Sequence, residues 1–110
     1  MLKNNLLNDI KFLCKQNYQF EICGFIVKDD NTYKFIQIDN KHPDKENNFL
    51  ISPKDYLEIK NKFKIVYLFH SHPNGGGFSQ IDLKYQKYHN LDMLVYDMKE
   101  DLLKEMKCKY

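Results

Sequence analysis

The chain has 110 residues, of which 43% are hydrophobic and 15% aromatic, enough for one core but not for two. Its formal net charge of +2 is too small to favour nucleic-acid binding. The three cysteines form no C-x-x-C pair, which argues against a disulfide framework. Since no long apolar run opens the chain, we expect a single cytoplasmic domain over residues 1–110, without a signal peptide or membrane span.

The first third of the chain predicts a helix followed by a hairpin. Residues 2–16 carry apolar side chains at three- and four-residue spacing, which is typical of an amphipathic helix. Residues 19–27 are apolar on both faces apart from Glu21, as in a central strand. The polar turn at 29–31 and the alternating residues 33–38 complete the predicted hairpin.

The middle of the chain predicts a loop, a helix and a buried strand. Residues 39–48 are polar and indicate a loop. Ser52 can cap a helix whose first residue is Pro53 and which ends near Phe63. Residues 64–69 are almost continuously apolar and predict a buried strand that runs directly into His70.

The last third predicts a helix over about 80–89 and a strand over 91–96. Residues 101–109 allow either a strand or a helix, and we favour a strand paired with 91–97. The order of elements predicts an α/β fold with a mixed β-sheet flanked by helices.

The segment around residue 70 suggests a metal site. His70 and His72 are two residues apart at the end of a strand, so both imidazoles face the same side. The glycine-rich loop 73–77 can turn the chain back, and Asp82 lies in the first turn of the next helix. Two histidines and one carboxylate leave a fourth zinc position open, as in catalytic zinc sites.

Each part of this pattern has a simpler interpretation when taken alone. Most His-x-His pairs bind no metal, three glycines are compatible with a mobile loop, and Ser79-x-x-Asp82 is typical of a capping box. The order of the parts favours a metal site, because strand, histidines, loop and capped helix converge on one point. Capping and metal binding are compatible with each other.

His70-Ser71-His72-Pro73 followed by Ser79-x-x-Asp82 resembles the JAMM motif of the JAB/MPN metalloprotease family. The upstream Glu21-Ile22-Cys23-Gly24 is similar to that family's glutamate-bearing strand. The resemblance covers nearly the whole chain and is closest to compact prokaryotic and phage-tail members. It implies a cytidine-deaminase-like sandwich, one zinc ion, and hydrolysis of peptide or isopeptide bonds, with the C-terminal tail of a ubiquitin-like protein among the candidate substrates.

The resemblance also implies a role for each site residue. His70, His72 and Asp82 would bind the zinc ion, Glu21 would act as general base, and Ser79 would help to stabilise the oxyanion. One departure concerns the spacing between His72 and Ser79, which is six residues here against the usual seven. The shorter loop affects the placement of Ser79 more than that of Asp82.

Other polar residues have less specific interpretations. Glu21 is the lone charge of an apolar strand, so it is either functional or solvated at an exposed strand end. Cys23 lies beside glycine and is better explained by core packing than as a nucleophile. We expect His42 and His89 at the surface, and Asn40 facing the cleft as a contact for the substrate backbone.

Two alternatives to a zinc peptidase stay open. The first is a non-catalytic JAMM-like assembly module of the phage-tail type. The second is a zinc amidase that acts on peptidoglycan peptides; a deaminase is disfavoured because the chain lacks His-x-Glu. We expect a protein or peptide substrate, no nucleic-acid or membrane partner, and a monomer or weak homodimer.

Overall fold

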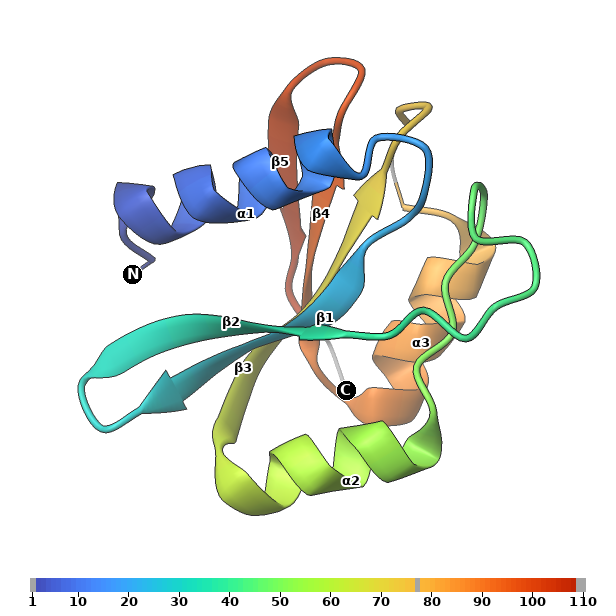
Figure 1. Ribbon diagram of the computed structural model, residues 1–110. Coiled ribbons are helices and arrows are strands. Elements are labelled where there is room, and N and C mark those ends of the chain that lie inside the picture. The colour runs from blue at the N-terminus through green and yellow to red at the C-terminus, as the bar shows by residue number, and fades with distance from the viewer. Residues whose placement is uncertain (1, 77, 109–110) are drawn as a thin grey trace.

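A five-stranded sheet forms the centre of the computed structural model, which describes residues 2–76 and 78–108 (Figure 1). The strands are β1 (Cys23–Asp29), β2 (Thr32–Ile38), β3 (Lys64–His72), β4 (Asp92–Asp97) and β5 (Leu102–Met106), and the helices are α1 (Asn4–Gln16), α2 (Pro53–Lys62) and α3 (Gln80–His89). The strands pair in the order β2-β1-β3-β4-β5. Only β3 and β4 run parallel among these pairs. The predicted α/β class with a mixed sheet is confirmed.

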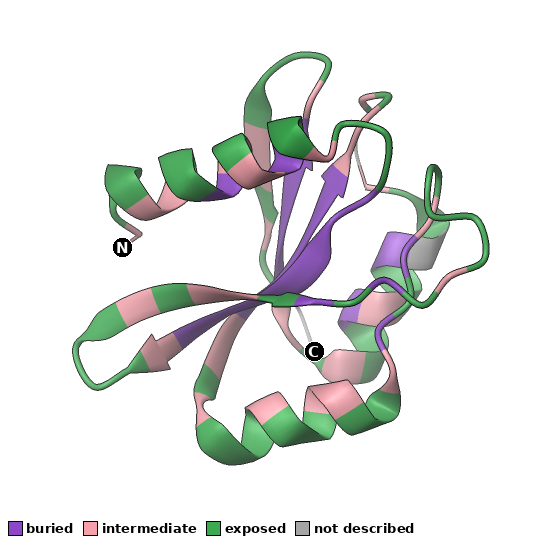
Figure 2. Cartoon of the chain, viewed as in Figure 1, coloured by how far each residue is buried: buried purple, intermediate pink, exposed green. Residues whose placement is uncertain are grey.

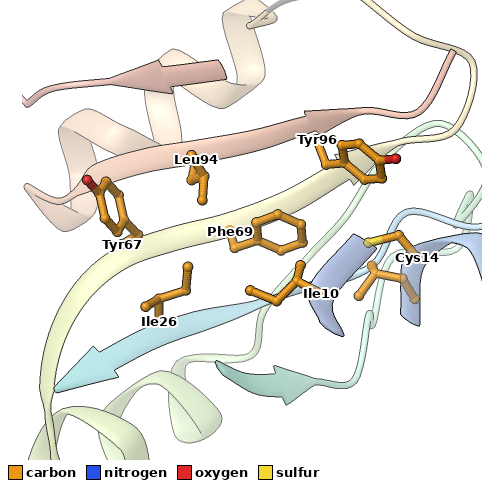
Figure 3. Close-up of a cluster of buried hydrophobic side chains, with 8 residues drawn as sticks. Ile10, Cys14, Ile26, Tyr67, Phe69, Leu94 and Tyr96 are labelled. Atoms are coloured by element: carbon orange, nitrogen blue, oxygen red, sulfur yellow. The ribbon is translucent and has the colours of Figure 1, made fainter. Parts of the chain in front are cut away.

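Helices cover both faces of the sheet, because side chains of buried strands alternate between the faces. On one face, Ile10 and Cys14 of α1 pack with Ile26 and Phe69 of the sheet (Figure 3). On the other face, α2 and α3 pack against a second cluster that includes Phe25. Figure 2 shows that the buried residues concentrate in the central strands. None of the described helices is long and apolar enough to cross a membrane.

The helices of the second face begin where their capping residues predict. The Ser52 hydroxyl accepts a hydrogen bond from the Asp55 amide at 3.1 Å, and Pro53 opens α2. Ser79 caps α3 in the same manner, and Asn90 ends it in the left-handed conformation with φ 55°. The capping signals in the sequence therefore determine where α2 and α3 begin and where α3 ends.

The strand predicted over residues 19–27 begins later, at Cys23. The Phe20 amide donates to the Asn17 carbonyl at 3.0 Å and closes a turn after α1. The Glu21 amide donates to the Lys45 carbonyl at 2.7 Å, so its hydrogen-bond partner lies in a loop and not in a neighbouring strand. Glu21 thus precedes β1 and is not part of it.

The last element is a strand, as favoured from the sequence. β5 pairs with β4 from Asp97↔Leu102 to Met93↔Met106. Residue 109 of the predicted segment lies outside the described residues. β3 also continues further than residue 69 and includes His70 and His72.

We predict that Gly24→Ala destabilises the protein by about 3 kcal/mol, because overpacking a rigid site is costly. An added methyl group would overlap the Ile36 carbonyl oxygen and lie 2.9 Å from Phe35 Cε1. Urea denaturation measures the effect. Gln37→Ala is the matched control, since Gln37 is the exposed partner of Gly24, and its change should stay within about 0.5 kcal/mol. Equal stability of the two variants would contradict the tight packing.

Candidate metal centre

The register of β1 against β3 brings the candidate residues together. Cys23 is paired with His70, which places the first histidine beside the start of β1. The pairing continues beyond the strand end, because the Ser71 amide donates to the Ile22 carbonyl at 2.9 Å. The Ile22 amide in turn donates to the Ser71 hydroxyl at 2.9 Å. The next position before Ile22 therefore lies near the second histidine.

Four predicted site residues meet at this point. The Nε2 atoms of His70 and His72 are 3.0 Å apart. Asp82 places Oδ1 3.1 Å from His70 Nε2 and Oδ2 3.5 Å from His72 Nε2. A carboxylate oxygen of Glu21 and one nitrogen of each histidine all lie within 4.8 Å of one another. Glu21, His70 and His72 could therefore hold a metal ion, and Asp82 contacts both histidines.

Glu21, His72 and Asp82 line a cleft of about 280 Å³, and His70 lies buried behind them. The floor of the cleft contains Glu21, His72 and Asp82, and Ser79 lies at its rim. The walls come from two loops, with Glu46, Asn47, Asn48 and Phe49 on one side and Pro73, Asn74 and Gly75 on the other. The site is thus open to a molecule from outside.

The two histidines differ in their exposure. His70 is fully buried, and the Phe49 ring stacks on it with centroids 4.5 Å apart. Phe49 also stacks on Tyr85 of α3 at 4.8 Å. The His72 side chain retains 13% of its exposure and faces the cleft. An incoming molecule therefore meets His72 before His70.

The surroundings of His72 differ from those of His70. Its Nε2 faces His70 Nε2 and Asp82 Oδ2, and its ring lies against the Gly76 backbone. Burial lowers the pKa of His72, but the hydrogen bond with Asp82, the charges of Glu21 and Asp82 and the contact with the Gly76 backbone outweigh burial and raise the pKa. Metal binding at this ring therefore displaces a proton. Within the described part of the chain, Nδ1 of His70 has no hydrogen-bond partner.

The donor set fits zinc. Imidazole nitrogens and carboxylate oxygens are the ligands that zinc takes in catalytic sites. Burial opposes ionisation of Asp82, but its hydrogen bonds to His70 and His72 outweigh this effect and hold its pKa below the usual value. Burial lowers the pKa of His70 and thereby favours the neutral ring that metal binding requires.

Glu21 has the opposite electrostatic environment from Asp82. Burial raises the pKa of Glu21 to about 7; His72 lowers it, and the nearby Asp82 and Asp44 raise it. A carboxylate that titrates near neutral pH is suited to accept a proton and return it. The two acids of the site therefore differ in their protonation. Asp82 stays ionised, whereas Glu21 can gain and lose a proton near neutral pH.

Ser79 and Asp82 form the predicted capping box. The Ser79 hydroxyl accepts from the Asp82 amide at 3.1 Å, and the Ser79 amide donates to Asp82 Oδ2 at 2.8 Å. The hydroxyl proton of Ser79 is not used in this arrangement and can be donated into the cleft. The confirmed capping box therefore leaves Ser79 and Asp82 Oδ1 available for chemistry.

Asn40 has a different role from the predicted substrate contact. Its amide donates to the Glu21 carbonyl at 3.0 Å and to the Asn48 carbonyl at 2.9 Å. Its side-chain oxygen accepts from the amides of His42 and Leu50, each at 3.0 Å. Every polar atom of this buried side chain is occupied, so the prediction is wrong. Asn40 holds the loop beside Glu21 in place. The sequence signal for this structural role was an asparagine that follows a strand and opens a polar loop.

Two further side-chain predictions can be compared with the structure. Cys23 is fully buried, and burial raises the pKa of its thiol to about 12, which agrees with core packing. His89 is half-buried, not at the surface, because its ring contacts Tyr56, Tyr85 and Tyr88 with centroid distances of 4.5, 5.6 and 5.0 Å. Neither residue reaches the cleft.

Comparisons with known proteins extend to the fold. The chain matches no protein-family model, and no curated protein matches its sequence. It is similar to the solution structure of protein DSY2949 from Desulfitobacterium hafniense, a structural genomics target, with a TM-score of 0.67 and 17% sequence identity. The alignment covers 96% of this chain and 88% of that chain. At this identity the likeness shows the fold alone.

We predict that the metal-free protein loses stability between about pH 4.5 and pH 7 relative to Glu21→Gln. The pKa of Glu21 rises from 4.5 to about 7 on folding, so within this interval only the folded state holds the proton. The free energy of unfolding then falls as pH rises. Urea denaturation of both proteins in chelator, over a pH series, measures the difference. If the free energies of unfolding of the two proteins change in parallel with pH, the pKa of Glu21 is not raised on folding.

Proposed function

We propose that this chain is a zinc-dependent peptidase or isopeptidase of the JAMM type. The observation that carries the proposal is the convergence of His70, His72 and Asp82 in a cleft beside an acid with a pKa of about 7. An assembly module would not need a second, exchangeable carboxylate at such a site. The cytidine-deaminase-like JAB/MPN sandwich belongs to the same proposal, and the mixed sheet with helices on both faces supports it.

The imidazoles of His70 and His72 and the Asp82 carboxylate would hold the metal. A bound zinc ion polarises the carbonyl of the substrate and lowers the pKa of water. The Gly76 backbone lies against the His72 ring, and the Ser79 amide donates to the Asp82 carboxylate. Both ligands are thus held by the backbone before a metal binds.

Glu21 would transfer the proton of the reaction. Its carboxylate accepts a proton from the attacking water as the new carbon–oxygen bond forms, and gives it to the nitrogen as the carbon–nitrogen bond breaks. Burial keeps the pKa of Glu21 near neutrality, so both transfers are accessible. The Ser79 hydroxyl would donate to the oxyanion of the substrate carbonyl.

The open cleft supports a polypeptide substrate over a small molecule. Asn47, Asn48 and Asn74 line its walls. The side-chain nitrogens of Asn47 and Asn48 donate to Asp44, which leaves their side-chain oxygens, and the amide of Asn74, for a peptide backbone. We therefore propose a protein or peptide substrate, with the flexible tail of a ubiquitin-like protein as the first class to test.

We predict that the purified protein retains about one zinc ion per chain and that His72→Ala abolishes this binding. Zinc at about 100 times its dissociation constant should stabilise the wild type by about 2.7 kcal/mol. Elemental analysis and thermal unfolding measure both effects. His42→Ala is the matched control, because its imidazole lies in the loop whose Asp44 amide it accepts at 2.9 Å, outside the cleft. A wild type that stays metal-free after zinc loading would refute the zinc site.

We predict that Glu21→Gln lowers the cleavage rate by about 100- to 10,000-fold while zinc is retained, because the base is lost and the ligands are kept. Tail-extended ubiquitin-like fusions and peptidoglycan peptides, each incubated with zinc-loaded protein, provide the measurement. Glu46→Gln is the control, since Glu46 is an exposed carboxylate of the same cleft. Equal rates for Glu21→Gln and the wild type would mean that another group is the base.

A further inference from the structure

We infer that Asp97 is a positioning residue of this site, which orients His72 through the Gly76 backbone. Asp97 lies at the carboxyl end of β4 and is paired with His72 across the parallel β3–β4 ladder. Its side chain makes no hydrogen bond with a proposed ligand or catalytic residue among the described residues. Its role would be to hold the loop that carries the chain from His72 to Ser79.

The Asp97 carboxylate is buried, with 2% exposure, and both oxygens are used. Oδ1 accepts from the amides of Lys99 and Glu100, each at 3.1 Å. Oδ2 accepts from the Gly76 amide at 3.2 Å and from Lys104 Nζ at 3.2 Å. One carboxylate therefore joins the β4–β5 turn, strand β5 and the glycine loop.

The glycine loop depends on this contact for its shape. Gly75 and Gly76 have φ values of 81° and 106°, which L side chains rarely adopt. A methyl group on Gly75 would lie 3.0 Å from Asp97 Oδ1 and 2.9 Å from Lys99 Cβ, so the loop packs directly on the carboxylate. A loop with this backbone freedom needs an external anchor to keep one conformation.

The anchor continues to the candidate ligand. The Gly76 amide donates to Asp97, and the Gly76 backbone also contacts the His72 ring. The backbone carbonyl of His72 is also fixed, by the amides of Gly75 at 3.0 Å and Met98 at 3.1 Å. Groups that orient a histidine in this way affect metal affinity, because they fix the ring and its tautomer.

The zinc-binding part of this inference rests on the proposed function, whereas the orientation of His72 can be measured without metal. We predict that Asp97→Asn weakens zinc binding by about 10- to 100-fold, measured by competition with a chelating dye. In this variant the side-chain NH2 group takes the place of Oδ2, which accepts from the Gly76 amide and from Lys104. Because an NH2 group is a donor, it cannot accept either hydrogen bond. We also expect the ¹⁵N resonances of the His72 ring in metal-free protein to shift in Asp97→Asn relative to the wild type, because the ring loses its fixed backbone support.

Asp92→Asn is the matched control. Asp92 lies on the same strand, accepts from the Cys108 amide at 2.8 Å and pairs with Lys107 at 3.5 Å. Like the Asp97 carboxylate, the Asp92 carboxylate therefore binds both a backbone amide and a lysine side chain. Both variants should lower the melting temperature, but only Asp97→Asn should change zinc affinity and the ¹⁵N resonances of the His72 ring. If Asp97→Asn loses stability and keeps both wild-type properties, Asp97 is merely structural and the inference is overturned.

A measurement on the wild type keeps the inference testable if Asp97→Asn does not fold. The Gly76 amide should exchange with solvent more slowly than the Asn74 amide, for which the described residues offer no acceptor. Equal exchange of the two amides would refute the anchor. A wild type that binds no zinc would refute the proposed function, while the ring resonances of His72 and the exchange rates would still decide the role of Asp97.

Discussion

The antiparallel register between β1 and β3 is the constraint on which the site depends. With Cys23 opposite His70, the chain before β1 must pass beside His72. The two hydrogen bonds between Ile22 and Ser71 extend this register past the end of β1. A slip of one residue would move every side chain of β1 to the other face of the sheet, and core and cleft would be lost together.

The loop between β2 and α2 gives the cleft its electrostatic character. Asn40 binds the Glu21 carbonyl, the Lys45 carbonyl binds the Glu21 amide, and Phe49 covers His70. These contacts hold the loop over the site, where burial raises the pKa of Glu21 and lowers the pKa of His70. A segment without regular secondary structure thus packs beside both groups, and its Asp44 also raises the pKa of Glu21.

Much of the fold could be predicted from the sequence, because its signals are local. The amphipathic period of α1, the caps at Ser52 and Ser79 and the apolar run of β3 each act within one element. The meeting of His70, His72 and Asp82 followed from the strand period and the glycine return. The late start of β1, the role of Asn40 and the contact of Asp97 with the glycine loop could not be predicted, since each depends on at least one partner 19 or more residues away along the chain.

The hairpin between β1 and β2 turns at Asp30 and Asn31, at the far end of β1 from Glu21. Seven residues of strand separate the two ends, or roughly 20 Å at the usual rise per residue. Short exposed turns of this kind accept insertions more readily than other parts of a domain. A fluorophore or an affinity tag placed there would report on the molecule, or immobilise it on a surface, while leaving the approach to the cleft free.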